Sequence, residues 1–131
     1  MANMLIRDSK EEETAPELDE RLFATPSIAL ERCREVMEKL AGTAMDAMKE
    51  SLDSLENGSG ALADSIREKE ELTDHNEDSL STYLVHLSTS RIRAEDSAEA
   101  AGMLRMAGDF ERIADYGVNL LESAEELRSK G

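Results

Sequence analysis

Two acidic pairs are the strongest chemical feature of this sequence. Glu70 and Asp74 are separated by three residues, and Glu111 and Asp115 repeat that spacing. On a helix, side chains four positions apart lie one turn apart on the same face, so each pair can offer two carboxylates to one cation. Carboxylate oxygens suit hard and borderline metal ions. We therefore predict a metal site formed by Glu70, Asp74, Glu111 and Asp115.

The acidic composition weakens this prediction when spacing is taken alone. The chain has 30 acidic residues among 131, so about seven acid pairs at this spacing are expected by chance, and the sequence has ten. A solvated, charged helix face therefore stays open as the alternative. Glu77 and Asp78 crowd the first pair, and a bound cation would relieve the repulsion among these carboxylates.

The composition favours helices as the elements that hold the acids. Aromatic residues make up only 3% of the chain, whereas small β-proteins draw on aromatic and β-branched residues. The strong helix formers Ala, Leu, Met, Glu, Lys and Arg dominate instead. The length supports one domain with a modest core.

Apolar residues recur at steps of three and four in three segments, and each segment predicts a helix. The first begins at Thr25-Pro26, a cap followed by proline at the first helical position, and ends at the turn 57–60. The second runs over about 61–90, and its stripe is interrupted between Ile66 and Leu80 by polar positions that include Thr73 and Asn76. The third runs over about 97–129, with Asp96 or Ser97 as its cap. Its predicted stripe is Met103, Met106, Phe110, Ile113, Gly117, Leu120, Ala124 and Leu127.

Three matched helices with short connections predict an all-α, antiparallel up-down-up three-helix bundle over residues 21–131, after a charged tail or linker over 1–20. Measured from the break near Arg93, the two acidic turns lie about 21 and 20 residues away, which places them side by side in an antiparallel hairpin. The phase of Ile113 places Glu111 and Asp115 on the outer face, together with Leu104, Gly108 and Val118. The predicted site is therefore open to solvent.

Charge excludes some partners. The net charge of −15 repels phosphate backbones and anionic membrane surfaces, so we expect no nucleic-acid partner. The sequence shows no apolar run that could span a bilayer, and we expect no direct membrane insertion of this segment and a cytoplasmic location.

Other reactive residues point to structure rather than catalysis. The single cysteine, Cys33, lies in an apolar helical stripe and is expected in the core. His75 and His86 fit surface and structural positions better than a metal shell. Because neither a serine–histidine nor a cysteine–histidine set is evident, we predict no catalytic residues and no enzyme activity.

Three segments resemble the PhoU family. Residues 109–119 read DFERIADYGVN, and Glu111, Arg112, Ile113, Ala114, Asp115 and Asn119 match the usual Glu-Arg-Ile-Gly/Ala-Asp-His-Ala form with its later Asn. The run from Glu70 through Asp74 to Ser88 is similar to the family's first Glu-x-x-x-Asp helix. Residues 18–31, LDERLFATPSIALE, resemble the junction into the cytoplasmic PhoU-like domain of bacterial Na/Pi-cotransporter-family proteins.

The resemblance, which covers residues 18 to about 127, has several implications. It implies a three-helix bundle of spectrin-like topology that binds metal at Glu70, Asp74, Glu111 and Asp115, and acts in phosphate uptake or its regulation. The ion would be divalent or ferric, and iron, zinc, magnesium and nickel are not distinguished. The implied partner is the membrane domain of a sodium-dependent phosphate transporter, in the same or another protein, at the inner face of the cell membrane. Thr73 and Asn76 depart from the family's apolar pattern.

Two other interpretations remain. The domain is a structural interaction module, which forms a homodimer or higher oligomer through its outer faces and has no metal site. Alternatively, it is a carboxylate-bridged di-iron enzyme; such bundles use four helices and Glu-x-x-His turns, and the sequence contains no Glu-x-x-His.

Overall fold

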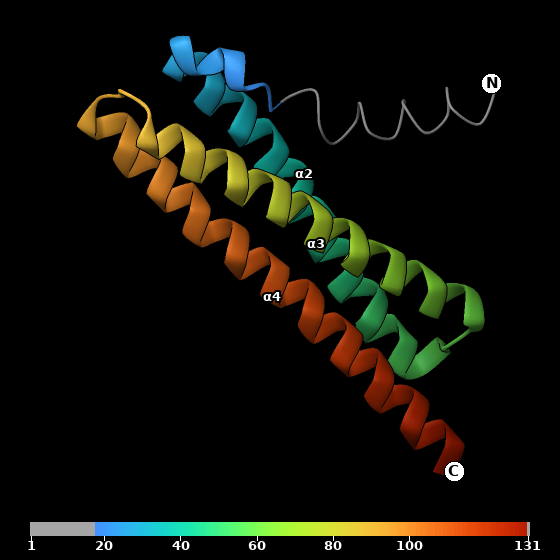
Figure 1. The fold of residues 1–131 in the computed structure, drawn as a ribbon. Coiled ribbons are helices and arrows are strands. Elements are labelled where there is room, and N and C mark those ends of the chain that lie inside the picture. Colours follow the sequence, from blue (N-terminus) through green and yellow to red (C-terminus); the bar gives the residue numbers. More distant parts are fainter. Residues whose placement is uncertain (1–17, 131) are drawn as a thin grey trace, which may run out of the picture.

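The computed structural model describes residues 18–130, and three long helices make up most of that range. They are α2 (Pro26–Asn57), α3 (Gly60–Thr89) and α4 (Ala94–Lys130), preceded by a short 3₁₀ helix, η1 (Glu20–Ala24). The helices run up, down and up, and each packs against the other two (Figure 1). No strand occurs within the described range. The predicted all-α three-helix bundle is confirmed.

The helix ends follow from local sequence, with one correction. Pro26 opens α2 at its first turn, although the Thr25 side chain makes no capping bond. Ser59 caps α3, because its side-chain oxygen accepts a hydrogen bond from the Leu62 backbone N–H at 3.1 Å. The prediction that Asp96 or Ser97 caps the last helix is wrong, since α4 already begins at Ala94. Acidic side chains in its first turn favour this earlier start through the helix dipole.

A large apolar cluster, here called the upper core, fills the end of the bundle near the α3–α4 connection. All three long helices contribute to it, and Leu18, Leu22 and Phe23 from the η1 region pack against it. Cys33 lies inside it, as predicted, and burial raises the pKa of its thiol to about 12. The buried members are Ala29, Leu30, Cys33, Val36, Met37, Leu40, Leu80, Tyr83, Leu84, Leu87, Ala100, Met103 and Ala107.

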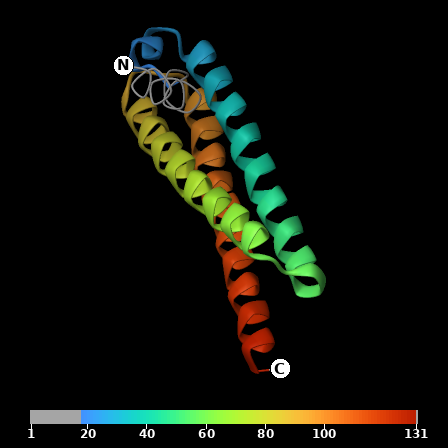
Figure 2. The ribbon, with the colours of Figure 1, turned by 90° about the vertical axis from the view of Figure 1, so that its right-hand side faces the viewer.

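The opposite end holds a much smaller cluster, the lower core, formed by Ala63, Ile66 and Leu121. In Figures 1 and 2 the C-terminal turns of α4 extend beyond the connection between α2 and α3 at this end. The Arg128 guanidinium there donates a hydrogen bond to the Ser54 backbone carbonyl, which ties α4 to the last turn of α2. This end is therefore held partly by polar contacts.

The polar layer is defined here as the buried residues Ser51, Ser54, Thr73 and Asn76: the last two fall between Ile66 and Leu80 on α3, and the two serines lie near the C-terminal end of α2. The gap in the apolar stripe of α3 thus faces the interior. The Thr73 hydroxyl donates to the Lys69 carbonyl at 2.7 Å, whereas Asn76 Oδ1 has no hydrogen-bond partner in the described residues. An unpaired buried amide oxygen costs free energy, so the middle of the bundle is held less firmly than the upper core.

The predicted stripe of α4 is only partly confirmed, because Met103, Gly117 and Ala124 are buried and its other five positions are not. The positions that are buried are mostly small: Ala100, Met103, Ala107, Ala114, Gly117, Leu121 and Ala124. A Cβ atom added at Gly117 would lie 3.0 Å from Ser51 Oγ and 3.5 Å from the Ala47 carbonyl oxygen. Such close packing of α2 and α4 selects small side chains. Phe110 and Ile113 are therefore only half-buried, and Met106 and Leu127 are exposed.

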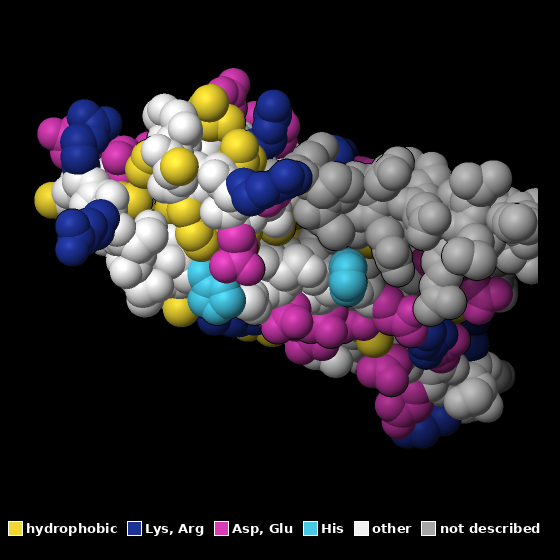
Figure 3. Space-filling view, turned by 45° about the horizontal axis from the view of Figure 1, so that its top comes forward, with side chains coloured by type: hydrophobic (Ala, Val, Ile, Leu, Met, Phe, Trp, Pro, Cys, Tyr) yellow, Lys and Arg dark blue, Asp and Glu magenta, His cyan; other side chains and the backbone are white. Residues whose placement is uncertain are grey.

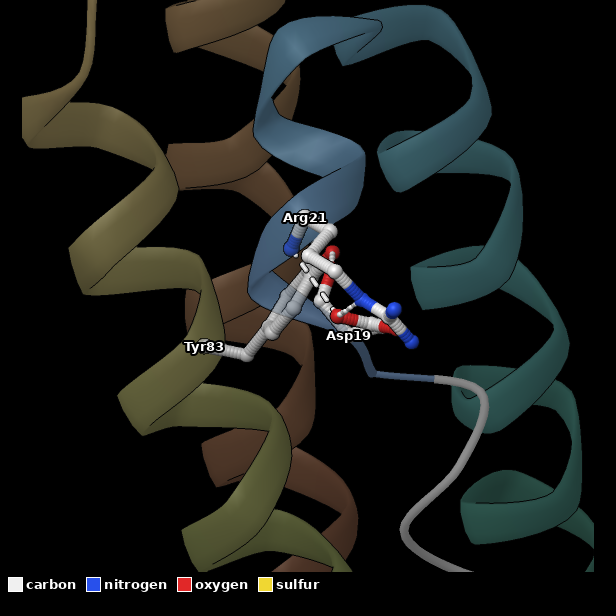
Figure 4. Close-up of polar contacts among 3 residues, drawn as sticks. All are labelled: Asp19, Arg21 and Tyr83. Atoms are coloured by element: carbon white, nitrogen blue, oxygen red, sulfur yellow. Dashed lines mark hydrogen bonds and ion pairs between the residues drawn. The ribbon is translucent and has the colours of Figure 1, made fainter.

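The η1 segment closes the upper end of the bundle. The Tyr83 hydroxyl donates to the Asp19 backbone carbonyl at 2.7 Å, and the Tyr83 ring packs on Phe23 with centroids 5.0 Å apart. Asp19 caps η1 and also binds the Arg21 guanidinium (Figure 4). The predicted linker over 1–20 therefore includes three residues, Leu18, Asp19 and Glu20, that contact the bundle. Residues 1–17 lie outside the described range.

Candidate metal centre

The four predicted ligands come from neighbouring flanks of α3 and α4. Glu70 and Asp74 lie on α3, and Glu111 and Asp115 lie on α4, which runs antiparallel to it. The Arg67–Glu125 ion pair, with nitrogen and oxygen 3.0 Å apart, joins the same two flanks nearer the lower core. The two acidic turns lie at similar distances along the chain from the α3–α4 connection, and they lie on this same side of the bundle. They are therefore close to each other.

The position of Glu111 and Asp115 corrects the prediction of an outer face. Leu104 packs against the upper core and Val118 against the lower core, although both were expected on the outside with the acids. Their flank of α4 therefore lies beside the core and faces α3. Glu111 is half-buried there, and Asp115 is exposed. The acids line the edge of the α3–α4 contact.

Burial and like charge both act on Glu70. Partial burial is the largest cause that raises the pKa of its carboxyl, because a charged form is less well solvated there. The negative charges of Asp74, Asp115, Glu111 and Glu71 raise this pKa further. Two of these charges come from the other helix, so the electrostatic coupling crosses the α3–α4 contact.

Glu111 shows the same behaviour from the α4 side. Burial again raises the pKa of its carboxyl most, followed by the charges of Asp115, Asp74 and Glu77, and Arg112 lowers it only in part. The Arg112 guanidinium lies 3.6 Å from the Asp109 carboxylate on the exposed side of α4. The two helices therefore concentrate negative charge at one place, and a bound cation would stabilise it.

Glu77 is the residue that the spacing argument left out of the ligand set. It is half-buried, its charge acts on Glu111, and its Oε1 accepts a hydrogen bond from Ser81 at 2.8 Å. Glu77 follows Asp74 by three positions, which also places two side chains on one helix face. A search for pairs three as well as four positions apart would have included it.

Neither the neighbouring lysine nor the two histidines are grouped with the four acids. Lys69 turns towards α2, where its Nζ lies 2.6 Å from Glu50 Oε2. His75 is exposed, and His86 Nδ1 lies 3.6 Å from Glu20 Oε1 beside η1. Figure 3 shows a band of acidic side chains along the middle of this face, next to the two histidines. Carboxylates are therefore the donors that this surface offers.

The donor chemistry fits a metal ion, but the side chains are not yet gathered around one point. Four carboxylates supply enough oxygens for a divalent or ferric ion. Within residues 18–130, however, no three Asp, Glu, His or Cys side chains are grouped as a ready site. The carboxylates influence one another's charge across the helix contact without converging. To share one ion they would have to rotate, which their partial exposure permits.

These observations define the class of protein: an all-helical bundle with a carboxylate-lined edge between two of its helices. A family model for the PhoU domain matches residues 37–124, a range that includes most of α2, all of α3 and most of α4. The chain belongs to the PhoU domain family. This membership indicates a general role in the regulation of phosphate transport.

Neither a curated protein nor a solved structure matches the chain significantly. None of the helices in the described part of the chain is both long and apolar enough to cross a membrane.

Proposed function

We propose that this chain is a regulatory, metal-binding domain of sodium-dependent phosphate transport, and that it acts by binding rather than by catalysis. Glu70, Asp74, Glu111 and Asp115 would hold a divalent or ferric ion across the contact between α3 and α4. The partner would be the membrane domain of the transporter, at the cytoplasmic face of the membrane. The resemblance of residues 18–31 to the junction in Na/Pi-cotransporter-family proteins supports this partner.

The observation that carries the metal proposal is the electrostatic coupling between the two helices. Burial raises the pKa values of Glu70 and Glu111, and acids of the opposite helix raise them further. Chance pairing in an acidic chain explains two Glu-x-x-x-Asp turns, but it gives no reason for both to face one another. A shared cation would favour the ionised carboxylates and offset their repulsion.

A site at this place suits regulation. An ion held by ligands from both helices would link α3 to α4 beside the polar layer, where Asn76 leaves an unpaired oxygen. Metal binding stabilises the state that binds it, by an amount set by ion concentration and affinity. Occupancy of the site would therefore change how firmly the middle of the bundle is held, and so change the surface offered to the transporter.

Calorimetric metal titration tests the proposal. The full chain, freed of metal by chelation, is titrated with zinc, nickel and magnesium chlorides, and with ferrous iron under anaerobic conditions. We expect one saturable site for at least one of these ions, and we expect Glu111→Gln/Asp115→Asn to remove it with helicity unchanged by circular dichroism. The matched control is Glu122→Gln/Glu126→Gln, an exposed pair at the same spacing on α4. The absence of any site in the wild-type chain, or equal loss in the control, would contradict the proposal.

The second candidate is a structural interaction module without a metal site. The exposed apolar side chains of α2 and α4, among them Leu52 and Met106, favour it. Light scattering with and without chelator separates the two functions. If the chain binds no metal and forms an oligomer whose size is the same with and without chelator, the structural module is supported.

A further inference from the structure

The bundle divides where the buried members of the upper core end. Residues 18–40 and 80–107 contain all of those members, and we call them the upper half. Residues 41–79 and 108–130, here called the lower half, contain the lower core and the polar layer. In Figure 1 the lower half is the end at which the chain passes from α2 to α3 and at which α4 ends. Each long helix therefore belongs to both halves.

The lower half buries few large apolar side chains. Five leucines are fully buried in the upper half, whereas the lower half has two fully buried side chains of comparable size, Ile66 and Leu121. Its other buried apolar residues are alanines, and the polar layer supplies four more buried positions. Because hydrophobic stabilisation grows with the apolar area that is buried, an alanine contributes much less than a leucine. Hydrophobic burial therefore stabilises the lower half far less than the upper half.

Net charge is divided even more unevenly between the halves. The upper half has eight acidic and seven basic residues, which give a net charge of −1. The lower half has 17 acidic and six basic residues, which give a net charge of −11. Uncompensated like charges repel one another and destabilise a compact state. The repulsion is thus concentrated in the half that has the smaller core.

Three polar contacts bridge the helices of the lower half, one for each pair of helices. Lys69 Nζ lies 2.6 Å from Glu50 Oε2 and joins α3 to α2. The Arg67–Glu125 ion pair joins α3 to α4, and Arg128 joins α4 to α2 through a backbone carbonyl. Ion pairs in contact with solvent each contribute little to stability. These bridging contacts therefore offset only part of the repulsion.

We infer that the lower half opens as one unit while the upper half stays folded. Opening relieves the repulsion within a net charge of −11 and gives up only a small core, whereas global unfolding also gives up the upper core. It separates Glu70 on α3 from Glu111 on α4, so only the closed form presents the complete acidic edge. The opening follows from core size and charge and does not require metal. It therefore goes beyond the proposed function and can fail independently of it.

Hydrogen exchange of the full chain in chelator, followed by mass spectrometry of peptides from both halves, tests the inference. Amides of the lower half should exchange together, through an opening that is more frequent than global unfolding. Amides of the upper half should exchange only through global unfolding and should be better protected. Equal protection of the two halves would overturn the inference.

Two mild truncations distinguish a separate opening from a single cooperative unfolding. Val36→Ala weakens the upper core, which stays intact in the open form, so it should speed exchange several-fold in the upper half alone. Ile66→Val weakens the lower core, whose contacts are lost in both the open and the unfolded forms. It should therefore speed exchange several-fold in both halves. Equal acceleration of both halves by Val36→Ala would overturn the inference.

A bridging-contact variant and added salt test the electrostatic cause of the opening. Lys69→Met removes the contact between α3 and α2 and should speed exchange of the lower half several-fold. The matched control Lys49→Met removes the same charge from an exposed position of α2 and should have a much smaller effect. Sodium chloride raised from about 10 mM to about 1 M shortens the Debye length from about 30 Å to about 3 Å and should slow this exchange. Exchange that does not respond to salt, or equal acceleration by the two variants, would overturn the electrostatic cause.

Discussion

The upper core and the polar layer differ in how they hold the same three helices. The upper core joins large apolar side chains from α2, α3 and α4 and is closed by η1. The polar layer places two serines of α2 and a threonine and an asparagine of α3 at buried positions; the three hydroxyls bond within their own helices, and one asparagine oxygen is unpaired. The acidic turns lie beside the polar layer, on the same turns of α3. The comparison shows that stability is concentrated at one end, while the charged edge lies where the bundle is held least firmly.

The largest expected effect is a difference in the unfolding free energy lost when a side chain is truncated in the upper core or in the lower core. Leu84→Ala truncates a fully buried side chain in the upper core and leaves a cavity. It should lower the unfolding free energy by about 4 kcal/mol, which is near the upper end of the range for buried leucine-to-alanine substitutions. Ile66→Ala in the lower core should cost about 2 kcal/mol, because its cluster is small and its partly buried neighbours Leu62 and Val118 can close the space. Chemical denaturation measures both. Equal losses would contradict the difference between the two ends.

A smaller effect of opposite sign is expected in the polar layer. Asn76→Leu keeps a similar side-chain volume and removes the unpaired Oδ1, so it should stabilise the fold by about 1–3 kcal/mol. The matched control is Asn119→Leu, at an exposed position of α4, which should change stability little. If Asn76→Leu instead destabilises the protein, the amide makes a useful bond in solution and the layer is not a weak point.

The pH dependence of stability should report the acidic edge. Burial and neighbouring charge raise the pKa of Glu111 in the folded protein above its ordinary value of 4.5. The folded state thus keeps this proton to higher pH than the unfolded chain does. Stability from the protonated group is complete below pH 4.5 and is lost as the pH rises through the raised pKa.

In chelator, Glu111→Gln should therefore raise the melting temperature slightly at pH 7 and reduce its fall between pH 4.5 and pH 7. Glu122→Gln, at an exposed position of α4, is the matched control and should do neither. Thermal melts at a series of pH values measure the effect. An identical response of the two variants would show that Glu111 experiences no special environment.

Periodicity and composition predicted the fold because they report directly on helices. The start of α2 at Pro26 and the turn after Asn57 agree with the sequence signals, and the α3 boundaries differ by one residue. The start of α4 was placed three residues too late, since Asp96 and Ser97 resemble caps although they lie inside the helix. The choice between cap and first turn depends on the preceding connection, which the local pattern does not describe.

The phase of α4 could not be read from hydrophobicity. Phe110 and Ile113 were predicted in the core because their side chains are large and apolar. The close approach of α2 at Gly117 instead requires small residues on the inner face of α4. Steric fit between helices is a tertiary property. The same error put Glu111 and Asp115 on an outer face, whereas the spacing from the α3–α4 connection correctly placed them beside the acids of α3. The metal itself stays a prediction.

A double-mutant cycle in metal affinity tests the central claim most directly, namely that α3 and α4 supply ligands to one site. Calorimetry would measure the affinity for the tightest-binding ion in the wild-type chain, Glu70→Gln, Glu111→Gln and the double variant. If one ion bridges both helices, the two losses should be non-additive, with a coupling energy of about 0.5–3 kcal/mol. Strictly additive losses, or loss from only one of the two substitutions, would contradict a shared site.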